Sequence, residues 1–252
     1  MTFDPWLIAS GCSAAAGAAV IYGVCAPRSS LFGPVVSHGS RDGPPRVALT
    51  FDDGPHPVVT PVVLDILRSH GIPAAFFVIG RNVVEHEAIA QRAAAEGHLI
   101  ANHTFDHQRS GAWRAFPYWR RELRQANDAV AAAIGQRPAL FRPPMGLKTP
   151  HILYACRREA MTLVTWNRRG LDGWRTTPQA ILRRLVCRCR GGDILVLHDG
   201  AEPGRDRDSR AMLQALPRLI DALRSRGLAF ERLDRLIARP GYLPDDPTAA
   251  RR

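Results

Sequence analysis

Lysine is almost absent from this chain: Lys148 is the only one among its 252 residues, so arginine supplies nearly all of the positive charge. The formal net charge is +11 at pH 7, and a basic surface favours anionic surroundings such as phospholipid head groups, acidic cell-wall polymers or nucleic acid. The arginines are scattered through helix-like segments, however, and no dense basic block with interleaved aromatic residues is present. The sequence therefore does not favour a specific nucleic-acid-binding function.

Cysteine is also scarce, and its spacing indicates no metal or disulfide chemistry. The five cysteines form no CxxC pair and no Cys/His arrangement of the zinc-finger type, and their odd number argues against a disulfide framework. No Walker-type phosphate loop and no GxGxxG motif follow the first strand-like run, so no motif supports nucleotide binding.

A long uncharged segment occurs once, from Trp6 to Cys25. Its length matches the roughly 20 residues that a helix needs to cross a hydrocarbon core, which makes it a candidate membrane anchor. Ala, Gly and Ser dominate its composition, so an Ala-rich helix packed on the domain is the alternative. No Lys or Arg precedes the segment, which disfavours a cleavable signal peptide. Arg28, Arg41 and Arg46 follow it, and by the positive-inside tendency they would keep the main domain in the cytoplasm.

Strand-like and helix-like patterns alternate along the rest of the chain as far as Ala238. Apolar runs predict seven strands, at Val47–Phe51, Ala74–Ile79, His98–Asn102, Ala139–Phe141, Thr162–Trp166, Asp193–Leu197 and Ala229–Arg232. The clearest helical patterns lie at Val62–His70, Val83–Glu96, Trp119–Ile134, Pro150–Ala160, Pro178–Cys189 and Arg210–Arg226. This alternation indicates an α/β fold with a parallel sheet, either doubly wound or closed into a barrel. We expect an apolar segment and linker at 1–36, one main domain at 37–238 and a loose tail at 239–252.

The first strand-like run ends at two adjacent carboxylates, Asp52 and Asp53, which Gly54 and Pro55 follow. In parallel α/β sheets, the carboxyl ends of the strands carry ligands and catalytic groups. A solvated turn is the alternative, because Asp-Gly is a common turn pair. The two acids indicate a site only if reactive groups from other strands join them.

Two histidines follow the third predicted strand, at the carboxyl end where a site is expected. His103 and His107 are four residues apart, which brings both imidazoles to one side of a turn, as metal binding requires. A surface histidine pair is the alternative. Two histidines and one carboxylate leave coordination positions open for water and substrate, as in catalytic rather than structural metal sites.

The fourth and sixth strands also end in polar groups. Arg142 opens the stretch Arg-Pro-Pro-Met-Gly, in which the N–H groups of Met145 and Gly146 are candidates to face a developing oxyanion. The sixth strand is a buried-type run that ends at His198. Each feature alone fits a turn or a core histidine, but all lie after predicted strands, where a site is expected.

These motifs together resemble the polysaccharide deacetylases of carbohydrate esterase family 4, also called the NodB-homology domain. The similarity covers about Arg46 to Ala238 and is carried by four stretches, Thr50 to Pro57, His103 to His107, Arg142 to Gly146 and Leu195 to Asp199. The resemblance implies a distorted, seven-stranded (β/α) barrel of NodB-homology type, with the apolar N-terminal helix added to it. It also implies a single metal and the hydrolysis of N-acetyl groups on amino sugars.

The resemblance further implies roles for five of these residues. Asp53, His103 and His107 would hold one divalent metal ion, with Zn²⁺ as the leading expectation and Co²⁺ or another divalent ion as the alternative. Asp52 would be the general base, and Arg142 would orient it. The chemistry is consistent, because a bound cation and a guanidinium both favour the charged carboxylate.

Five further residues complete the expected site. His198 would be the general acid that protonates the departing amine. We expect Leu197 and Trp174 to line a small apolar pocket for the acetyl methyl group. Met145 stands where many family members have an aromatic residue, which alters a sugar contact but leaves a backbone oxyanion donor. Asp172 is our candidate for the acid that raises the pKa of His198, although its spacing is shifted from the family pattern.

The leading hypothesis is a metal-dependent amidohydrolase that removes acetyl groups from a peptidoglycan- or chitin-like glycan. One alternative is a deacylase or deformylase of a lipid-linked amino sugar, suggested by the segment 6–25 and the basic surface. Another is a catalytically inactive glycan-binding protein. No feature specifies an oligomeric state. The resemblance favours a membrane-anchored enzyme that faces the periplasm or exterior, whereas the arginine distribution favours the cytoplasm.

Overall fold

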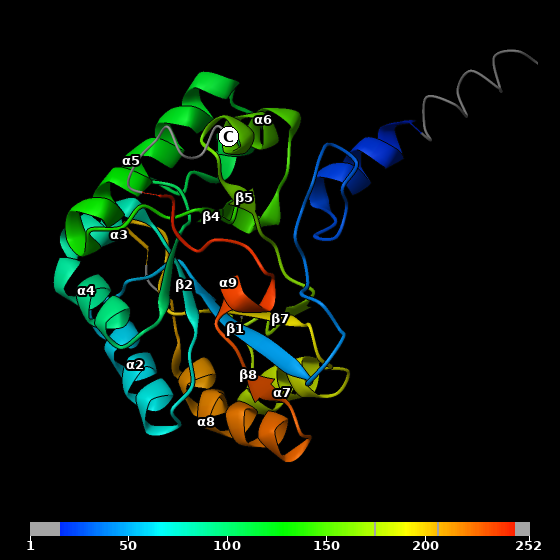
Figure 1. Ribbon diagram of the computed structural model, residues 1–252, viewed down its shortest axis with the longest axis vertical. Helices are drawn as coiled ribbons and strands as arrows, with labels where there is room; N and C mark the ends of the chain where they lie inside the picture. The colour runs from blue at the N-terminus through cyan, green and yellow to red at the C-terminus, as the bar shows by residue number, and fades with distance from the viewer. Residues whose placement is uncertain (1–15, 174, 206, 245–252) are drawn as a thin grey trace, which may run out of the picture.

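The structure, a computed structural model, describes residues 16–173, 175–205 and 207–244. A curled parallel sheet forms its centre, and helices cover the outside of the sheet (Figure 1). The strand order is β5-β4-β3-β2-β1-β7-β6, with β8 paired to β1, and no pairing joins β5 to β6 within the described residues. The expected distorted (β/α) barrel is thus confirmed, in an incompletely closed form.

All seven predicted strands occur, and one short strand was missed. The described strands are β1 (Arg46–Asp52), β2 (Ala75–Val78), β3 (Leu99–Asn102), β4 (Leu140–Phe141), β5 (Thr162–Leu163), β6 (Arg168–Arg169), β7 (Ile194–His198) and β8 (Ala229–Phe230). The missed strand is β6, whose two arginines give no apolar run from which a strand could be predicted. The central strand is β1, which pairs in parallel with β2, β7 and β8.

The helices differ from the prediction at two places, because the short helix Leu233–Leu236 was not predicted and one predicted helix is interrupted. After an N-terminal helix at residues 16–25, the described α-helices are α2 (Val59–Ser69), α3 (Gly80–Glu85), α4 (Glu87–Ala95), α5 (Phe116–Ile134), α6 (Pro150–Arg158), α7 (Pro178–Val186), α8 (Arg210–Ser225) and α9 (Leu233–Leu236), with 3₁₀ turns η1 (Arg109–Trp113) and η2 (Pro144–Gly146). The single helix predicted over Val83–Glu96 is wrong. It is two helices, α3 and α4, separated at His86, whose φ of −133° and ψ of 46° are not helical.

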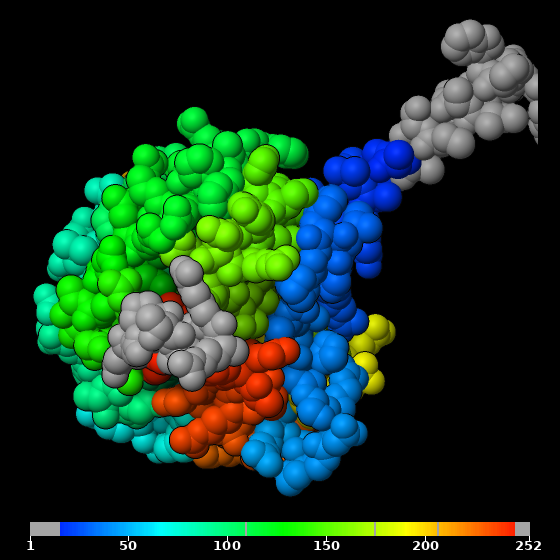
Figure 2. Space-filling view, turned by 45° about the horizontal axis from the view of Figure 1, so that its top comes forward, coloured from blue at the N-terminus to red at the C-terminus, as the bar shows by residue number. Residues whose placement is uncertain are grey.

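The N-terminal helix covers residues 16–25 and lies at one side of the main body (Figures 1 and 2). Val20, Ile21 and Tyr22 are exposed, whereas Val24 is buried. Residues 6–15 of the candidate anchor lie outside the described residues. In the part of the chain that the structure describes, no helix combines the length and the apolarity needed to cross a membrane.

Both expected flanking segments are partly built into the domain. Val36 bridges to Val164 beyond β5, and His38 bridges to Asp193 beside β7, so the linker spans the open side of the sheet. At the other end of the chain, the hydroxyl oxygen of Tyr242 accepts a hydrogen bond of 3.1 Å from the Ile100 N–H. Residues 239–244 are therefore anchored, which corrects the expectation of a loose tail for that part.

Side chains of β1 alternate between the barrel interior and the layer under the helices. Ala48 belongs to the interior cluster, whereas Leu49 and Phe51 pack in the cluster that α2 and α8 cover. A strand directs every second side chain to the same face, so Thr50 and Asp52 continue the inward set of Ala48. The last residue of β1 is therefore delivered into the mouth of the barrel.

The outer layer generates a stability prediction on α2. Leu64 is fully buried, whereas Val62 on the same helix is 39% exposed. We expect Leu64→Ala to lower the free energy of unfolding by about 2–5 kcal/mol, because it removes buried methyl groups and leaves a cavity. Val62→Ala is the matched control and should cost much less. Denaturant unfolding of both variants measures the difference, and equal losses would contradict the described packing of α2.

Candidate active site

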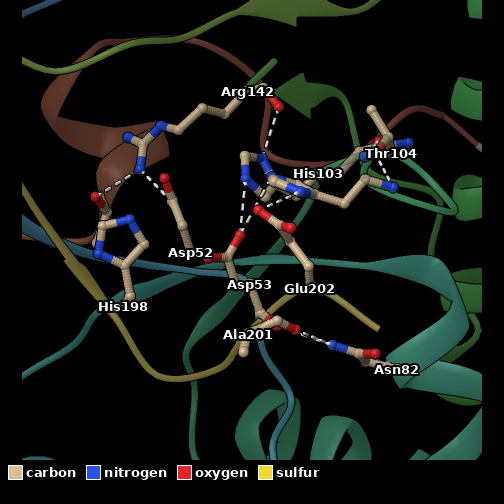
Figure 3. A network of polar contacts seen from close by, with 12 residues as sticks. Asp52, Asp53, Asn82, His103, Thr104, Arg142, His198, Ala201 and Glu202 are labelled. Carbon is tan, nitrogen blue, oxygen red and sulfur yellow. Dashed lines mark hydrogen bonds and ion pairs between the residues drawn. The ribbon is translucent and has the colours of Figure 1, made fainter. Parts of the chain in front are cut away.

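The predicted polar residues meet at the carboxyl ends of the strands (Figure 3). Asp52 is the last residue of β1 and His198 is the last residue of β7, and the parallel register pairs the two directly. His103 follows β3, and Arg142 follows β4. Asp52, His198 and His103 line one cavity of about 330 Å³. The structure thus brings together side chains that are far apart in the sequence.

A candidate metal centre lies in this cavity. The Oδ1 atom of Asp53 lies 3.3 Å from the Nε2 atoms of both His103 and His107, and all three side chains are buried. Four tetrahedral ligands about 2.0–2.1 Å from a central ion lie roughly 3.4 Å from one another. The two O···N distances therefore fit ligands around a cation better than charge-assisted hydrogen bonds, which are about 2.7–2.9 Å long. One carboxylate and two imidazoles suit a divalent metal with open positions.

The protonation states of the three groups also suit a cation. The Nδ1 atom of His103 lies 2.7 Å from the carbonyl oxygen of Arg142 and must donate to it, so the lone pair of Nε2 faces the cavity. Burial lowers the pKa of His107 to about 4, so that its imidazole is neutral at pH 7. Burial would raise the pKa of Asp53, but its contacts with the neighbouring imidazoles hold this pKa well below its usual range, so the carboxylate is charged at pH 7.

Arg142 fixes the position of Asp52. Its Nη1 atom donates hydrogen bonds of 2.6 Å to Asp52 Oδ1 and 2.9 Å to Thr50 Oγ1, and Nη2 donates one of 3.1 Å to the Thr165 carbonyl. The guanidinium is fully buried and stacks 3.8 Å from the centre of the Phe77 ring. These contacts hold the Asp52 carboxylate in one orientation at the edge of the cavity.

Asp172 contacts His198 twice. Its Oδ1 atom lies 3.0 Å from His198 Nδ1, and its Oδ2 atom accepts a hydrogen bond of 2.8 Å from the His198 backbone N–H. Burial alone would lower the pKa of His198, but the charge and hydrogen bond of Asp172 raise it to about 9. The imidazolium is therefore the main form at pH 7, and its Nε2 N–H can supply a proton to a group in the cavity.

Three expected substrate contacts have different outcomes. Met145 lines the cavity with a side chain that is 59% exposed. Leu197 does not line it: this side chain is fully buried in the cluster under the helices, while its neighbour Val196 lines the cavity. The correction follows from strand geometry, because Leu197 must face away from the side to which His198 points. Trp174 lies outside the described residues.

The two candidate oxyanion donors also differ. The Gly146 N–H donates to the Pro143 carbonyl at 2.9 Å, so the expectation that it faces an oxyanion is wrong. For the Met145 N–H, no acceptor is found among the described residues. Met145 has a φ of 56°, an uncommon conformation for a non-glycine residue. The Met145 N–H is therefore the remaining candidate oxyanion donor in this loop.

Three side chains that the sequence analysis missed surround the metal centre. Arg207 donates a hydrogen bond of 2.9 Å from Nη2 to Asp53 Oδ2. Asn82 donates from Nδ2 to the backbone oxygens of Asp53, at 2.9 Å, and Ala201, at 3.3 Å. Glu202 Oε1 lies 3.7 Å from Nδ1 of His107. Glu202 and Arg207 lie in the loop between β7 and α8, and this position after a strand was the signal that could have found them.

Two glycines let the loops after β1 and β7 touch. A Cβ atom on Gly54 would lie 2.3 Å from Asp199 Oδ2, and one on Gly200 would lie 2.2 Å from the Asp53 carbonyl oxygen. Asp199 is fully buried, its Oδ2 accepts a hydrogen bond of 2.6 Å from Thr60, and burial raises its pKa to about 7. The close approach fixes the backbone on both sides of Asp53.

Comparisons with known proteins agree on one family. Residues 39–164 match the family model described as polysaccharide deacetylase. A chitooligosaccharide deacetylase from Bradyrhizobium sp. (strain ANU 289) is 36% identical over 213 residues, which cover 82% of this chain and 97% of that protein. A peptidoglycan-N-acetylglucosamine deacetylase from Bacillus cereus is 29% identical over 204 residues, 76% of this chain and 87% of that protein.

Solved structures give the same result. The crystal structure of a peptidoglycan N-acetylglucosamine deacetylase has a TM-score of 0.77 and 27% identity, and the match covers 82% of this chain and 94% of that chain. A family 4 carbohydrate esterase from Streptomyces lividans, solved in complex with acetate, has a TM-score of 0.69 and 26% identity. That match covers 81% of this chain and 98% of the esterase.

The contacts of Asp172 generate a prediction about the titration of His198. In Asp172→Asn the raising charge is lost while burial remains, so we expect the pKa of His198 to fall from about 9 to below its ordinary value of 6.5. NMR titration of the imidazole C–H signals measures this shift, with the His198 signal assigned by its loss in His198→Gln. Asp208→Asn, at an exposed acid, is the control. An unchanged titration near pH 9 in Asp172→Asn would contradict the role given to Asp172.

Proposed function

The chain belongs to the polysaccharide deacetylase family, carbohydrate esterase family 4, and from this membership we propose that it hydrolyses the N-acetyl groups of an amino-sugar glycan. The observation that carries the proposal is the meeting of Asp53, His103 and His107 with Asp52 and His198 in one cavity. A metal centre, a carboxylate and an imidazolium are the groups that metal-assisted amide hydrolysis requires.

The metal is a divalent ion held by Asp53, His103 and His107, and we propose zinc because one carboxylate and two imidazoles are ligands that it commonly has in catalytic sites. Cobalt is the alternative, since the same ligands suit it. When bound, the cation would supply Lewis-acid polarisation of the amide carbonyl and a lower pKa for water. All other steps use side chains and one backbone N–H of this chain.

In the proposed reaction Asp52 is the general base. It takes a proton from the water that attacks the acetyl carbonyl carbon, and Arg142 holds the carboxylate in place at 2.6 Å. The Met145 N–H is the proposed donor to the carbonyl oxygen, on which negative charge develops. As the C–N bond breaks, His198 donates its proton to the amine nitrogen, and acetate leaves. Asp172 keeps His198 charged for this step.

The proposed substrates are oligomers that contain N-acetylglucosamine. The relatives named above act on chitooligosaccharides and on peptidoglycan, and both carry this sugar. A second candidate is an acylated amino sugar linked to a lipid, which the exposed apolar side chains of Val20, Ile21 and Tyr22 favour. Acetate release from a soluble oligosaccharide and from a lipid-linked sugar, measured side by side, separates the two.

The location follows from the substrate in this proposal. Assembled peptidoglycan lies outside the cytoplasm, so for this substrate we propose that the enzyme faces the periplasm or exterior, with the cytoplasm as the alternative. A reporter fused at the C-terminus and active on only one side of the membrane tests the location. Activity of a reporter that works only in the cytoplasm would contradict the proposal.

Removal of the base and removal of the metal should have separable effects. We expect Asp52→Asn to lower kcat for acetate release at least about 100-fold, since general-base catalysis contributes roughly 10²–10⁴. Its metal content, measured by mass spectrometry, should match that of the wild type, because Asp52 is not a proposed ligand. Chelation should abolish activity in the wild type, and added Zn²⁺ or Co²⁺ should restore it.

The matched control is Asp128→Asn, at an acid on α5 whose side chain is 60% exposed, and it should keep wild-type activity. Full activity of a metal-free preparation would contradict the metal-dependent mechanism. Binding of N-acetylated glycans without acetate release, in the presence of bound metal, would instead support the inactive glycan-binding protein.

A further inference from the structure

A second cavity, of about 290 Å³, adjoins the active-site cavity. Met145, Trp166 and Arg169 line both cavities, so a chain that extends from the reacting sugar past these residues enters the second one. Its volume is close to the volume of about 330 Å³ of the active-site cavity. The second cavity therefore has room for one further unit of a sugar chain.

The N-terminal segment supplies part of the wall of the second cavity. Cys25, Pro27 and Arg28 line it, and all three precede residue 39, where the match to the family model begins. The other lining residues come from the loop after β4 and from the stretch that leads into β6. This part of the wall is thus added to the region that the family model matches.

Lys148, the only lysine of the chain, holds the N-terminal segment in place. It is 1% exposed, and lysine is almost never buried to this degree unless its ammonium group has a partner. Its Nζ atom donates a hydrogen bond of 2.6 Å to the Ala26 carbonyl oxygen, and its backbone N–H donates one of 3.0 Å to the Val24 carbonyl oxygen. Lys148 lies three residues after Met145, so these bonds attach the segment to the loop that lines both cavities.

A further hydrogen bond connects the segment with the surroundings of the proposed base. Thr165 Oγ1 donates a bond of 2.7 Å to the Pro27 carbonyl oxygen. The carbonyl oxygen of Thr165 in turn accepts the bond from Arg142, which orients Asp52. The wall is therefore held from two sides, and a wall that is already ordered lowers the cost of binding a ligand.

The lining suits a neutral sugar ring, which has apolar C–H faces and hydroxyl groups at its edges. Pro27, Met145 and Trp166 contribute apolar surface, and Arg28 and Arg169 contribute N–H donors for hydroxyl or acetamide oxygens. Binding sites for small ligands commonly combine apolar surface with a few polar groups in this way.

We propose that the second cavity is a subsite for the sugar unit next to the reacting N-acetylated sugar, and that Lys148 is a positioning residue that holds the wall at residues 25–28. The inference rests on the proposed deacetylase function and names the residues that would favour an oligomer over a single amino sugar. The N-terminal segment is then part of the substrate site as well as the connection to the N-terminal helix.

The test compares substrates with one and two sugar units. Acetate release is measured from N-acetylglucosamine and from N,N′-diacetylchitobiose, in which one sugar can react while the other occupies the subsite. The value of kcat/KM for each substrate, and the metal content, are determined for the wild type and for Cys25→Trp and Lys148→Met. Cys25 is exposed and lines the second cavity, so a tryptophan there fills the cavity without replacing a buried side chain.

Two further variants serve as controls. Val20 is exposed on the same helix as Cys25 and lines neither cavity, so Val20→Trp is the matched control for the bulk of the new side chain. Cys25→Ser controls for the loss of the thiol. Both variants should retain the substrate preference of the wild type.

We expect the wild type to prefer the disaccharide. Cys25→Trp should lower this preference at least about 10-fold, the lower end of the effect of one misfit group in a binding pocket. The loss should fall on the disaccharide and leave metal content and the rate with the single sugar unchanged. Lys148→Met should also lower the preference, because the Ala26 carbonyl oxygen loses its partner and the wall is released.

An unchanged preference in Cys25→Trp would overturn the subsite. Equal losses with both substrates in Lys148→Met, or no loss at all, would overturn the positioning role of Lys148. These outcomes leave the deacetylase function intact. Absence of acetate release by the wild type from both compounds and from peptidoglycan would overturn the proposed function itself.

Discussion

The buried Arg142 holds the two halves of the site in one geometry. Its guanidinium binds Asp52 on β1, while its own backbone carbonyl accepts the Nδ1 proton of His103 after β3. A buried charge is costly unless it is paired and hydrogen-bonded, and Arg142 meets this condition through Asp52, Thr50 and the Thr165 carbonyl. One residue thus fixes both the proposed base and one proposed metal ligand. Neither of these two side chains can shift without breaking its buried contact with Arg142.

The backbone around the cavity is held in uncommon conformations. Among the described non-glycine residues with positive φ, five lie in the site loops: Asp53, Thr104, His107, Met145 and Leu171. Such conformations cost energy and persist only where the surroundings impose them. At Asp53 the surroundings are visible: Asn82 binds its carbonyl oxygen, and Gly200 packs against the same atom with no room for a Cβ. The strain and its supports together direct Asp53 Oδ1 at the two imidazoles.

Much of the site could be predicted because its chemistry lies at strand ends. Asp52 and His198 end apolar runs, and parallel strands bring their carboxyl ends to one edge, so the sequence alone places them together. To predict which side chains face the cavity, the alternation of side chains along a strand must also be used. Leu197 precedes His198 and must face the other side of the sheet, so its assignment to the cavity could have been rejected from the alternation alone.

Other features depend on contacts that leave no periodic signal. The Asn82 side chain donates hydrogen bonds to backbone oxygens of distant loops. In the sequence, it cannot be distinguished from any other polar residue on α3. The break at His86 is similar, since the apolar pattern runs on through α3 and α4 while the backbone does not. Tertiary contacts decide these positions, and a single sequence carries little trace of them.

The side-chain charges of the site pair off almost completely in the structure. Arg142 faces Asp52, Arg207 faces Asp53, and the imidazolium of His198 faces Asp172. A divalent cation on Asp53 would add two positive charges next to these buried pairs. The excess positive charge would favour the negative charge that develops on the reacting carbonyl oxygen.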